Sequence, residues 1–302
     1  MENIIEKIKE LNIGKVEGDV LLRKYNTYRV GGTALGIVYP KNADSLVKLI
    51  RFLRVENIKY KVLGFGSNVL FSNTFYDGII IKLDEFNDVT FYKTGKVKVG
   101  AGYSLIKLAL LTAKKNLTGL EFAAGIPGSV GGSVFMNAGA YKSDMGYVVE
   151  RVKVLTPDLK IIYLENKEMN FHYRTSFLHT HPDYICIEVI FKLRKGKRDA
   201  IEEVIKERRQ RRLDSQPLEY PSAGSVFRNP EGNFAGKLIE DVGLKGMKHG
   251  GAMVSDKHAN FIVNYDNATS DDIKYLIDLC HDKVYEEYGI DMKVEQEFVN
   301  WE

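Results

Sequence analysis

The first sixty residues alternate between helix-like and strand-like patterns of apolar positions. One face of residues 1–16 collects apolar side chains at helical spacing: Ile4, Ile5, Ile8 and Leu11. Residues 43–56 repeat the helical spacing, and they lead directly into the strand-like residues 59–63. This order predicts an amphipathic N-terminal helix followed by a β-α-β unit.

The middle of the chain is dominated by strand-like patterns. Residues 79–81 are a short apolar run of the buried-strand kind, and residues 89–99 alternate as a hairpin around a Thr-Gly turn. Residues 104–115 have helical spacing, with Ser104 in the N-cap position. Strand-like patterns then return in three runs, at residues 148–155, 160–164 and 184–193.

The last third of the chain mixes helices with short strands. A charged segment at residues 194–198 leads into a strong helix over residues 199–212, where we place the main domain boundary. The elements expected after it are a loop at 213–230, a helix at about 234–242, a strand at 260–264, a helix at 271–288 and a strand at 292–299. Ser270 is the expected cap of the long helix and Gly289 its expected stop.

The composition is that of an ordinary globular protein, and its 302 residues are enough for two or three domains with cores of their own. The net charge of +3 is small for this length, so bulk attraction to nucleic acid or to a membrane is not expected. The N-terminus carries acidic residues and lacks the apolar core of a secretory signal, and no apolar run approaches the length of a membrane span. We therefore expect neither a nucleic-acid partner nor membrane insertion.

The cysteines and histidines argue against disulfide and metal chemistry. Cys186 and Cys280 are far apart and lack C-x-x-C spacing, as expected for buried free thiols in a reducing cytoplasm. The six histidines form no H-x-x-x-H motif and no cluster with cysteine. No metal site is predicted, and the predicted location is the cytoplasm.

The most informative stretch is residues 123–141, AAGIPGSVGGSVFMNAGAY, in which glycines alternate with other small residues. Glycine permits backbone conformations with positive φ and lets another molecule approach the main chain closely. Successive free N–H groups in such a loop form a concave anion site. The stretch is therefore either a cradle for the pyrophosphate of a large cofactor or a turn that only lets two elements pack, and taken alone it does not decide between them.

Two further glycine turns favour the cradle. Residues 63–70, LGFGSNVL, follow a strand-like run, and residues 100–102, GAG, follow the alternating KVKV. Ser67 and Asn68 add side-chain donors to the first of these turns. The spacings differ from G-x-G-x-x-G and from the P-loop, so neither a Rossmann nor a Walker site is indicated.

These glycine motifs, together with VGGTA at residues 30–34, resemble the FAD-binding domain of the vanillyl-alcohol-oxidase type. More closely, GIPGSVGG and the later GSVFRNP are similar to the UDP-N-acetylenolpyruvoylglucosamine reductase family of peptidoglycan synthesis, over nearly the whole chain from about residue 25. The resemblance implies an α+β fold with an FAD-binding domain over residues 1–197, in subdomains of about 1–83 and 84–197. A smaller substrate-binding domain over residues 198–302 follows, and its C-terminal strand contributes to the active site.

By the same resemblance, the cofactor is non-covalent FAD and its reductant is NADPH. The residues expected to bind FAD lie in the three glycine motifs: Gly64, Phe65, Gly66, Ser67, Asn68, Gly100, Gly125, Ile126, Pro127, Gly128, Ser129, Gly131, Gly132, Asn137, Ala138 and Gly139.

Ser225 lies in the loop YPSAGSVFRNP at residues 220–230. From the residues alone it is a turn residue, a nucleophile or a proton donor, although the G-x-S-x-G frame of a nucleophile is absent. The family resemblance selects the proton donor. Reduction of an enolpyruvyl double bond needs such a donor, because hydride addition to the terminal carbon leaves negative charge on the neighbouring carbon, which must be protonated.

Two charged residues are expected to act with this donor. Arg174, in FHYRTS at residues 171–176, takes the position of the family's catalytic arginine, and its guanidinium can pair with a carboxylate. A surface arginine at a strand end is the alternative. In the terminal VEQEFV, alternation on a strand places Glu295 and Glu297 on one face and does not choose between them. The family motif points to Glu297 as the catalytic acid.

The expected substrate contacts lie mainly in the second domain. A basic cluster at residues 208–212 is, by its pattern alone, a solvated helix face or a nucleic-acid patch. The resemblance adds that Arg212 reaches the diphosphate of the substrate. Lys237 opens a helix, where it either binds phosphate or is a surface lysine. The other residues that match substrate positions of the family are Tyr173, Asn229 and His258.

The resemblance implies NADPH-dependent reduction of UDP-N-acetylglucosamine enolpyruvate to UDP-N-acetylmuramate, with hydride from N5 of reduced FAD and a proton from Ser225. The compact segment between residues 174 and 184 resembles the shorter subtype, which lacks a tyrosine-bearing lid. The protein is expected to be a monomer or a weak oligomer. Two other functions are kept: an FAD-dependent oxidase of the same fold acting on an alcohol or sugar, and a non-catalytic flavin- or nucleotide-binding module.

Overall fold

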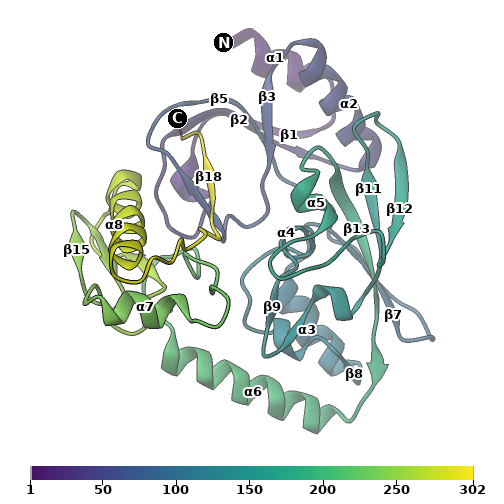
Figure 1. The fold of residues 1–302 in the computed structure, drawn as a ribbon. Coiled ribbons are helices and arrows are strands. Elements are labelled where there is room, and N and C mark those ends of the chain that lie inside the picture. The colour runs from purple at the N-terminus through teal and green to yellow at the C-terminus, as the bar shows by residue number, and fades with distance from the viewer. Residues whose placement is uncertain (1, 302) are drawn as a thin grey trace. The chain divides into compact units, whose positions relative to one another are not determined.

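The computed structural model describes residues 2–301 (Figure 1). The chain divides into two compact units. Unit 1 contains the chain up to Gly18 together with Leu35–Phe65 and Asp77–Gln210, and unit 2 contains Asp19–Ala34, Gly66–Tyr76 and the chain from Arg211 onward. Two short N-terminal segments thus belong to the same unit as the C-terminal third, which no pattern in the sequence indicated. The division falls inside helix α6 (Arg198–Ser215), and the predicted domain boundary near residue 197 stays a prediction.

The first part of unit 1 is a four-stranded sheet with two helices. Its strands are β1 (Gly14–Leu21), β2 (Thr33–Pro40), β3 (Lys59–Val62) and β5 (Tyr76–Ile81), in the order β1-β2-β5-β3, with β3 parallel to β5. The helices α1 (Glu2–Glu10) and α2 (Ala43–Val55) bury their apolar faces in one core. The residues they contribute to it include Ile5, Ile8, Leu46, Leu49, Ile50 and Leu53. The predicted N-terminal helix and the predicted strand–helix–strand order are confirmed.

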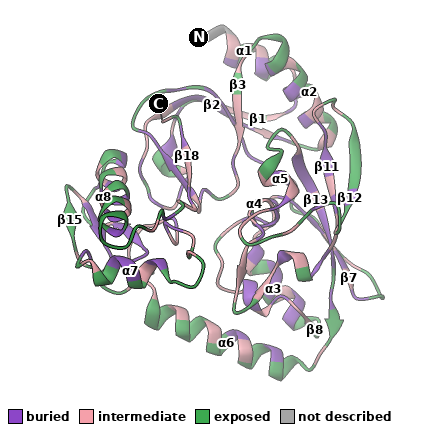
Figure 2. Cartoon of the chain, in the orientation of Figure 1, coloured by how far each residue is buried: buried purple, intermediate pink, exposed green. Residues whose placement is uncertain are grey.

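The second part of unit 1 is a five-stranded antiparallel sheet in the order β12-β11-β13-β7-β6. Its strands are β6 (Val89–Phe91), β7 (Lys96–Gly100), β11 (Val149–Leu155), β12 (Ile161–Glu165) and β13 (Ile185–Lys192). The central strand β13 is buried along most of its length (Figure 2), in keeping with its nearly continuous apolar sequence ICIEVIFK. The predicted hairpin and the three predicted strand-like runs are confirmed.

Shorter elements complete unit 1 and carry the glycine motifs. Helix α3 (Leu105–Lys114) begins after Ser104, whose hydroxyl accepts a hydrogen bond from the Lys107 N–H, so this predicted N-cap is confirmed. The other elements are α4 (Val130–Phe135), α5 (Phe177–Thr180), the hairpin of β9 (Gly139–Ala140) and β10 (Ser143–Asp144), and the pair of β8 (Leu117–Thr118) and β14 (Arg194–Lys195). Helix α6 exposes most of its length (Figure 2), and its buried residues are Ile201 and Ile205.

Unit 2 is built around helix α8 (Ser270–Tyr288) and a three-stranded antiparallel sheet. The sheet consists of β15 (Lys248–His249), β16 (Ala252–Val254) and β17 (Ile262–Asn264), in that order. One face of α8 is buried in the core of the unit, through Ile273, Leu276, Ile277, Cys280 and Val284. The remaining elements are α7 (Ala235–Asp241) and the parallel pair of β4 (Val69–Phe71) and β18 (Glu297–Val299).

The predicted cap of α8 is wrong by one residue. The cap is Thr269, whose hydroxyl accepts a hydrogen bond from the Asp272 N–H at 3.1 Å, while the Asp272 carboxylate accepts one from the Thr269 N–H at 2.8 Å. This reciprocal capping box satisfies two donors at the helix start, whereas Ser270 is buried in the first turn. The predicted stop at Gly289 is confirmed, and its φ of 66° is the left-handed value of a helix C-terminus.

The predicted closing strand is shorter than expected. Instead of residues 292–299, only Glu297–Val299 pair as a strand, with β4. Upstream of it, Val294 makes an isolated bridge to Phe227. The cause is tertiary, because the terminal segment changes its partner from the loop around residue 227 to β4 as it proceeds.

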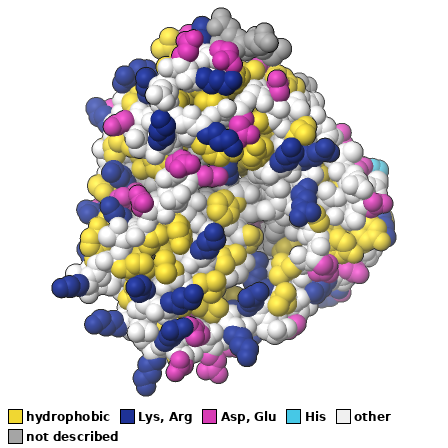
Figure 3. All heavy atoms as spheres, turned by 180° about the vertical axis from the view of Figure 1, so that it is seen from behind, with side chains coloured by type: hydrophobic (Ala, Val, Ile, Leu, Met, Phe, Trp, Pro, Cys, Tyr) yellow, Lys and Arg dark blue, Asp and Glu magenta, His cyan; other side chains and the backbone are white. Residues whose placement is uncertain are grey.

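Cysteine burial and surface charge agree with the composition. Cys186 and Cys280 are free and buried, as predicted, and burial raises the pKa of each thiol to about 12. Basic side chains are spread among acidic and uncharged ones over the face drawn in Figure 3. Among residues 2–301, no helix is both long and apolar enough to cross a membrane.

The capping box gives a test of the α8 boundary. We expect Thr269→Ala to lower the free energy of unfolding of unit 2 by about 1 kcal/mol, because the Asp272 N–H loses its partner. Thr269→Ser keeps a hydroxyl and is the control. Urea unfolding followed by the fluorescence of Trp301, the single tryptophan and a residue of unit 2, measures the difference. Equal midpoints for the two variants would contradict the capping role.

Candidate active site

The three glycine motifs meet within unit 1. The Gly131 N–H donates to the Ala101 carbonyl at 2.8 Å, and a Cβ built on Gly131 would lie 2.9 Å from the Ala101 Cβ. A Cβ built on Gly64 would lie 2.6 Å from the Ser129 hydroxyl oxygen. Side chains at these two glycines would push the segments apart, so the close approach that the sequence suggested is present.

Backbone donors remain available where these segments meet. The Leu105 N–H donates to the Gly128 carbonyl at 3.0 Å, and the Ser129 hydroxyl caps α4 by accepting from the Gly132 N–H at 3.2 Å. Within residues 2–301, the N–H groups of Gly128 and Ser129 themselves donate to no protein acceptor. Adjacent unpaired N–H groups in a glycine-lined loop suit an anionic group such as a diphosphate. The residues present therefore fit a pyrophosphate-containing cofactor.

Lys82 supports the first glycine turn and was missed in the sequence. Its side chain is only 7% exposed, its ammonium donates to the Gly64 carbonyl, and it pairs with Asp84 at 3.3 Å. The ammonium also lies 5.7 Å from the centre of the Phe65 ring. Burial lowers the pKa of this amine, although Asp84 opposes the shift. The only signal in the sequence was a single lysine inside the apolar run IIIKL.

The other predicted FAD-binding residues divide between the two units. Unit 1 contains Phe65 and all of those from Gly100 to Gly139, whereas Gly66, Ser67 and Asn68 belong to unit 2. Two side chains already have partners in the chain. The Asn137 amide donates to the His172 carbonyl at 2.8 Å and accepts from the Gly146 N–H at 3.0 Å. The Asn68 amide donates to the Glu295 carbonyl at 3.1 Å.

Two of the predicted glycines are required by close packing. A Cβ on Gly100 would collide with the backbone of Phe86, and a Cβ on Gly66, which has a φ of 66°, would collide with the backbone of residues 25 and 26. These glycines shape the turns, and their contact with the cofactor stays a prediction, as it does for Gly125, Ile126, Pro127 and Ala138.

Arg174 lies at a tight turn of unit 1 beside the main glycine stretch. The backbones of His172 and Thr175 exchange hydrogen bonds of 2.9 and 3.0 Å across this turn. Arg174 has a φ of 54°, and its guanidinium donates to the Gly139 carbonyl at 3.1 Å and lies 5.1 Å from the centre of the half-exposed Tyr173 ring. A non-glycine residue held in the left-handed region is typical of functional sites.

In unit 2, the structure brings Ser225 and the terminal acidic segment together. The Glu295 N–H donates to the Val226 carbonyl at 2.7 Å, one residue after Ser225. The Gln296 amide donates to the Ala223 and Gly224 carbonyls, each at 3.3 Å. Within the described residues, the Ser225 hydroxyl itself has no hydrogen bond to the protein. Its proton therefore remains available to a bound molecule.

The two acids of the terminal segment have different environments. Glu297 is in β18 opposite Val69, and its N–H donates to the Asn68 carbonyl at 2.9 Å. Tyr76 lies near it, since burial and then the charge of Glu297 raise the pKa of Tyr76 to about 12. Glu295 precedes the strand, so the expectation of two acids on one strand face does not hold. The choice of Glu297 as the catalytic acid stays a prediction.

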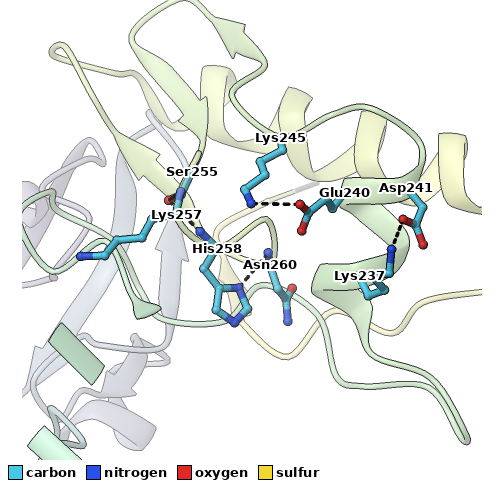
Figure 4. A network of polar contacts seen from close by, with 8 residues as sticks. All are labelled: Lys237, Glu240, Asp241, Lys245, Ser255, Lys257, His258 and Asn260. Carbon is cyan, nitrogen blue, oxygen red and sulfur yellow. Dashed lines mark hydrogen bonds and ion pairs between the residues drawn. The ribbon is translucent and has the colours of Figure 1, made fainter. Parts of the chain in front are cut away.

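The predicted substrate residues Asn229 and Lys237 lie at α7. The Asn229 side chain accepts from the Ala235 N–H at 3.1 Å, at the start of this helix. Figure 4 shows Lys237 paired with Asp241 one turn later, and the Lys237 side chain is 67% exposed. Arg212 is in the last turn of α6, in unit 2. Contact of these residues with substrate stays a prediction.

His258 accepts a hydrogen bond that constrains its protonation. Figure 4 shows its ring beside Asn260, and the Asn260 N–H donates to the His258 Nδ1 at 3.2 Å. An acceptor nitrogen carries no proton, so this contact requires the neutral ring. Burial lowers the pKa of His258, and the nearby Lys245, which pairs with Glu240 at 3.1 Å, lowers it further.

Comparison with known proteins identifies the family. A model of the FAD binding domain matches residues 34–164, and a model of the UDP-N-acetylenolpyruvoylglucosamine reductase C-terminal domain matches residues 216–299. The UDP-N-acetylenolpyruvoylglucosamine reductase of Anoxybacillus flavithermus is 43% identical over 299 residues, which cover 99% of both chains. The chain belongs to the UDP-N-acetylenolpyruvoylglucosamine reductase family. The reductase of Bacillus subtilis is also similar, at 40% identity over 299 residues and 99% of both chains.

A solved structure of the same family has a similar fold. The crystal structure of the UDP-N-acetylenolpyruvylglucosamine reductase of Thermus caldophilus superposes with a TM-score of 0.80 at 36% identity, covering 94% of this chain and 98% of that one. The family resemblance drawn from GIPGSVGG and GSVFRNP, and the predicted α+β fold with an FAD-binding domain, are confirmed. The two domain matches cover the glycine motifs and Ser225, whereas Arg174 lies between them.

Two histidines of unit 2 are expected to titrate in opposite directions from the ordinary value of about 6.5. Burial lowers the pKa of His258, so its favourable neutral form is present at high pH and is lost as the pH falls through the folded pKa. Asp291 and Asp282 raise the pKa of the largely exposed His281, so the stability from its charged form is lost as the pH rises. Histidine ring resonances followed against pH, and assigned with His258→Gln and His281→Gln, test this order. A midpoint for His258 above that of His281 would contradict it.

Proposed function

We propose that this chain is an NADPH-dependent flavoprotein that reduces UDP-N-acetylglucosamine enolpyruvate to UDP-N-acetylmuramate, a precursor of peptidoglycan. The observation that carries the proposal is the Ser225 hydroxyl, free of protein partners and next to the acid-bearing terminal segment, in a chain that matches this reductase family over its full length. A cytoplasmic location and a monomer or weak oligomer are parts of the same proposal.

The glycine motifs of unit 1 would hold FAD. The Gly128 and Ser129 N–H groups would donate to its diphosphate, and the absence of side chains at Gly64 and Gly131 would let it approach the backbone closely. Lys82 would keep the Gly64 carbonyl turned away from that anion by donating to it. When bound and reduced by NADPH, FAD supplies the hydride for the enolpyruvyl double bond.

Ser225, Arg174 and Glu297 would act on the other carbon of that bond. Hydride addition to the terminal carbon leaves an electron pair on the carbon next to the carboxylate, and the Ser225 Oγ would give its proton to that carbon. The Arg174 guanidinium would pair with the carboxylate and stabilise the developing charge, and Glu297 would do so as a neutral acid. Tyr173, Arg212, Asn229, Lys237 and His258 are the proposed contacts to the rest of the UDP-sugar.

The oxidase alternative shares the FAD-binding domain but not the second domain. An oxidase would pass electrons to oxygen and would need no proton donor in the loop GSVFRNP, and a non-catalytic binding module would need neither. Both alternatives therefore leave the free Ser225 hydroxyl without a purpose.

Substitution of Ser225 separates the three functions. We expect Ser225→Ala to slow reoxidation of the reduced flavin by the enolpyruvyl substrate about 10²–10⁴-fold, the usual contribution of a general acid, while flavin reduction by NADPH is unchanged. Anaerobic stopped-flow absorbance measures each step, and Ser222→Ala in the same loop is the control. A wild-type protein that is reoxidised by oxygen but not by the substrate would support the oxidase, and one that binds no flavin would remove the proposal.

Substitution of Gly64 tests the cradle. A methyl group there would lie 2.6 Å from the Ser129 hydroxyl oxygen, so we expect Gly64→Ala to weaken FAD binding about tenfold, within the usual penalty of about 1–3 kcal/mol for overpacking. Removing that oxygen in Gly64→Ala/Ser129→Ala should recover part of the loss, with Ser129→Ala alone as the reference. Fluorescence titration of the deflavinated protein with FAD gives the dissociation constants. Identical constants for wild type and Gly64→Ala would place the cofactor elsewhere.

A further inference from the structure

Gln296 connects the candidate proton donor to the interior of unit 2. Its side chain lies between Glu295 and Glu297 in sequence, and the residue is 5% exposed. The amide nitrogen donates to the Ala223 and Gly224 carbonyls at 3.3 Å and lies 3.5 Å from the Ser225 carbonyl. These are the residues that set the position of Ser225, which we call, with Val226 and Phe227, the Ser225 loop (residues 223–227).

The other end of the Gln296 amide is held by a buried tyrosine. The Tyr28 hydroxyl donates to the Gln296 Oε1 at 3.1 Å, and Tyr28 is fully buried. Burial raises the pKa of this phenol, so it keeps its proton and remains a donor at any physiological pH. Because the oxygen of the amide is engaged with Tyr28, its nitrogen is directed at the Ser225 loop. A side chain here must therefore accept at one atom and donate at the other, which an amide does.

A second buried amide holds the Ser225 loop on its other side. The Asn260 side chain donates to the Phe227 carbonyl at 2.8 Å and accepts from the Phe227 N–H at 2.9 Å. The Asn260 carbonyl accepts from the Val226 N–H at 2.9 Å. Asn260 is in turn placed by the His258 ring (Figure 4). The backbone of the loop is thus bonded before and after Ser225, while the Ser225 hydroxyl has no protein partner among the described residues.

We propose that Gln296 is a positioning residue for proton transfer, which holds the Ser225 backbone in place and leaves the hydroxyl free for the substrate. The inference rests on the proposed function and adds to it. In the step concerned, the O–H bond of Ser225 breaks and a C–H bond forms at the carbon next to the carboxylate, which supplies the electron pair, and the serine oxygen regains a proton from water. Transfer to carbon requires close alignment, and a displacement of about 1 Å reduces such rates about 10²-fold.

The test separates the two half-reactions of the FAD-loaded enzyme. We expect Gln296→Met, which keeps the length of the side chain but removes its hydrogen bonds, to slow reoxidation by the enolpyruvyl substrate about 10–100-fold. Flavin reduction by NADPH needs no Ser225 proton, so its rate should stay within about twofold of wild type. The substrate dissociation constant should change little, and the solvent deuterium isotope effect on reoxidation should increase because proton transfer becomes more limiting.

Two further variants and a control keep the result interpretable. Gln296→Glu replaces the donor nitrogen with an acceptor oxygen that faces the same carbonyls, and it should slow reoxidation more than Gln296→Met does. Tyr28→Phe frees the amide to rotate and should have a smaller effect in the same step. Asn300→Ala is the control, because the Asn300 amide bonds Ser72, Thr74 and Phe75 in the same terminal segment without contacting the Ser225 loop.

The outcomes distinguish this inference from the proposed function. If the wild-type flavin is not reoxidised by the substrate, the proposed function fails. If the wild type is reoxidised but the Gln296 variants slow both half-reactions equally, or neither, or act only through substrate affinity, Gln296 has a structural role and the positioning role is wrong. Should Gln296→Met not retain FAD, Tyr28→Phe must slow reoxidation selectively for the inference to stand.

Discussion

Close contact between backbones, made possible by the lack of side chains, is the constraint on which unit 1 depends. Gly131 donates to the Ala101 carbonyl, and Gly64 faces the Ser129 hydroxyl at a distance that leaves no room for a methyl group. Since the polypeptide itself forms this surface, its N–H groups are presented directly to a ligand and need no flexible side chains to order. The binding of FAD by this reductase family is thereby coupled to the packing of three segments that are distant in the sequence.

Unit 2 holds its reactive group by a different means. The strands there are short, and β18 contains only three residues, so backbone pairing alone gives little rigidity. Buried amides take over this task, as Gln296 and Asn260 do for the Ser225 loop and Asn68 does for the terminal segment. A buried amide must have both of its ends satisfied, so each one specifies the positions of at least two segments at once. Precise placement of a hydroxyl is thus obtained from a loop.

Both units follow one physical rule, which is that the reactive groups are left free while their surroundings are fully bonded. The Ser225 hydroxyl and the Gly128 and Ser129 N–H groups have no protein partners within the described residues, whereas the neighbouring backbone groups do. Arg174 is held differently, by a strained backbone and a bond to Gly139, at the edge of the glycine stretch. Such preorganisation removes the need to reorient polar groups during the reaction.

The sequence by itself determined the local structure and the chemistry. Apolar periodicity predicted the helices and the strands of unit 1, Ser104 was identified as a cap, and the glycine and GSVFRNP motifs indicated the family, because each of these signals depends on neighbouring residues. It did not determine the cap at Thr269, which depends on a side chain returning from Asp272, or the short β18, which depends on pairing with β4. Lys82 and Gln296 were missed for the same reason, since a lysine or glutamine acquires its role only from the carbonyls that the fold places beside it. Only the tertiary structure decides such roles, because they arise from groups that lie far apart along the chain.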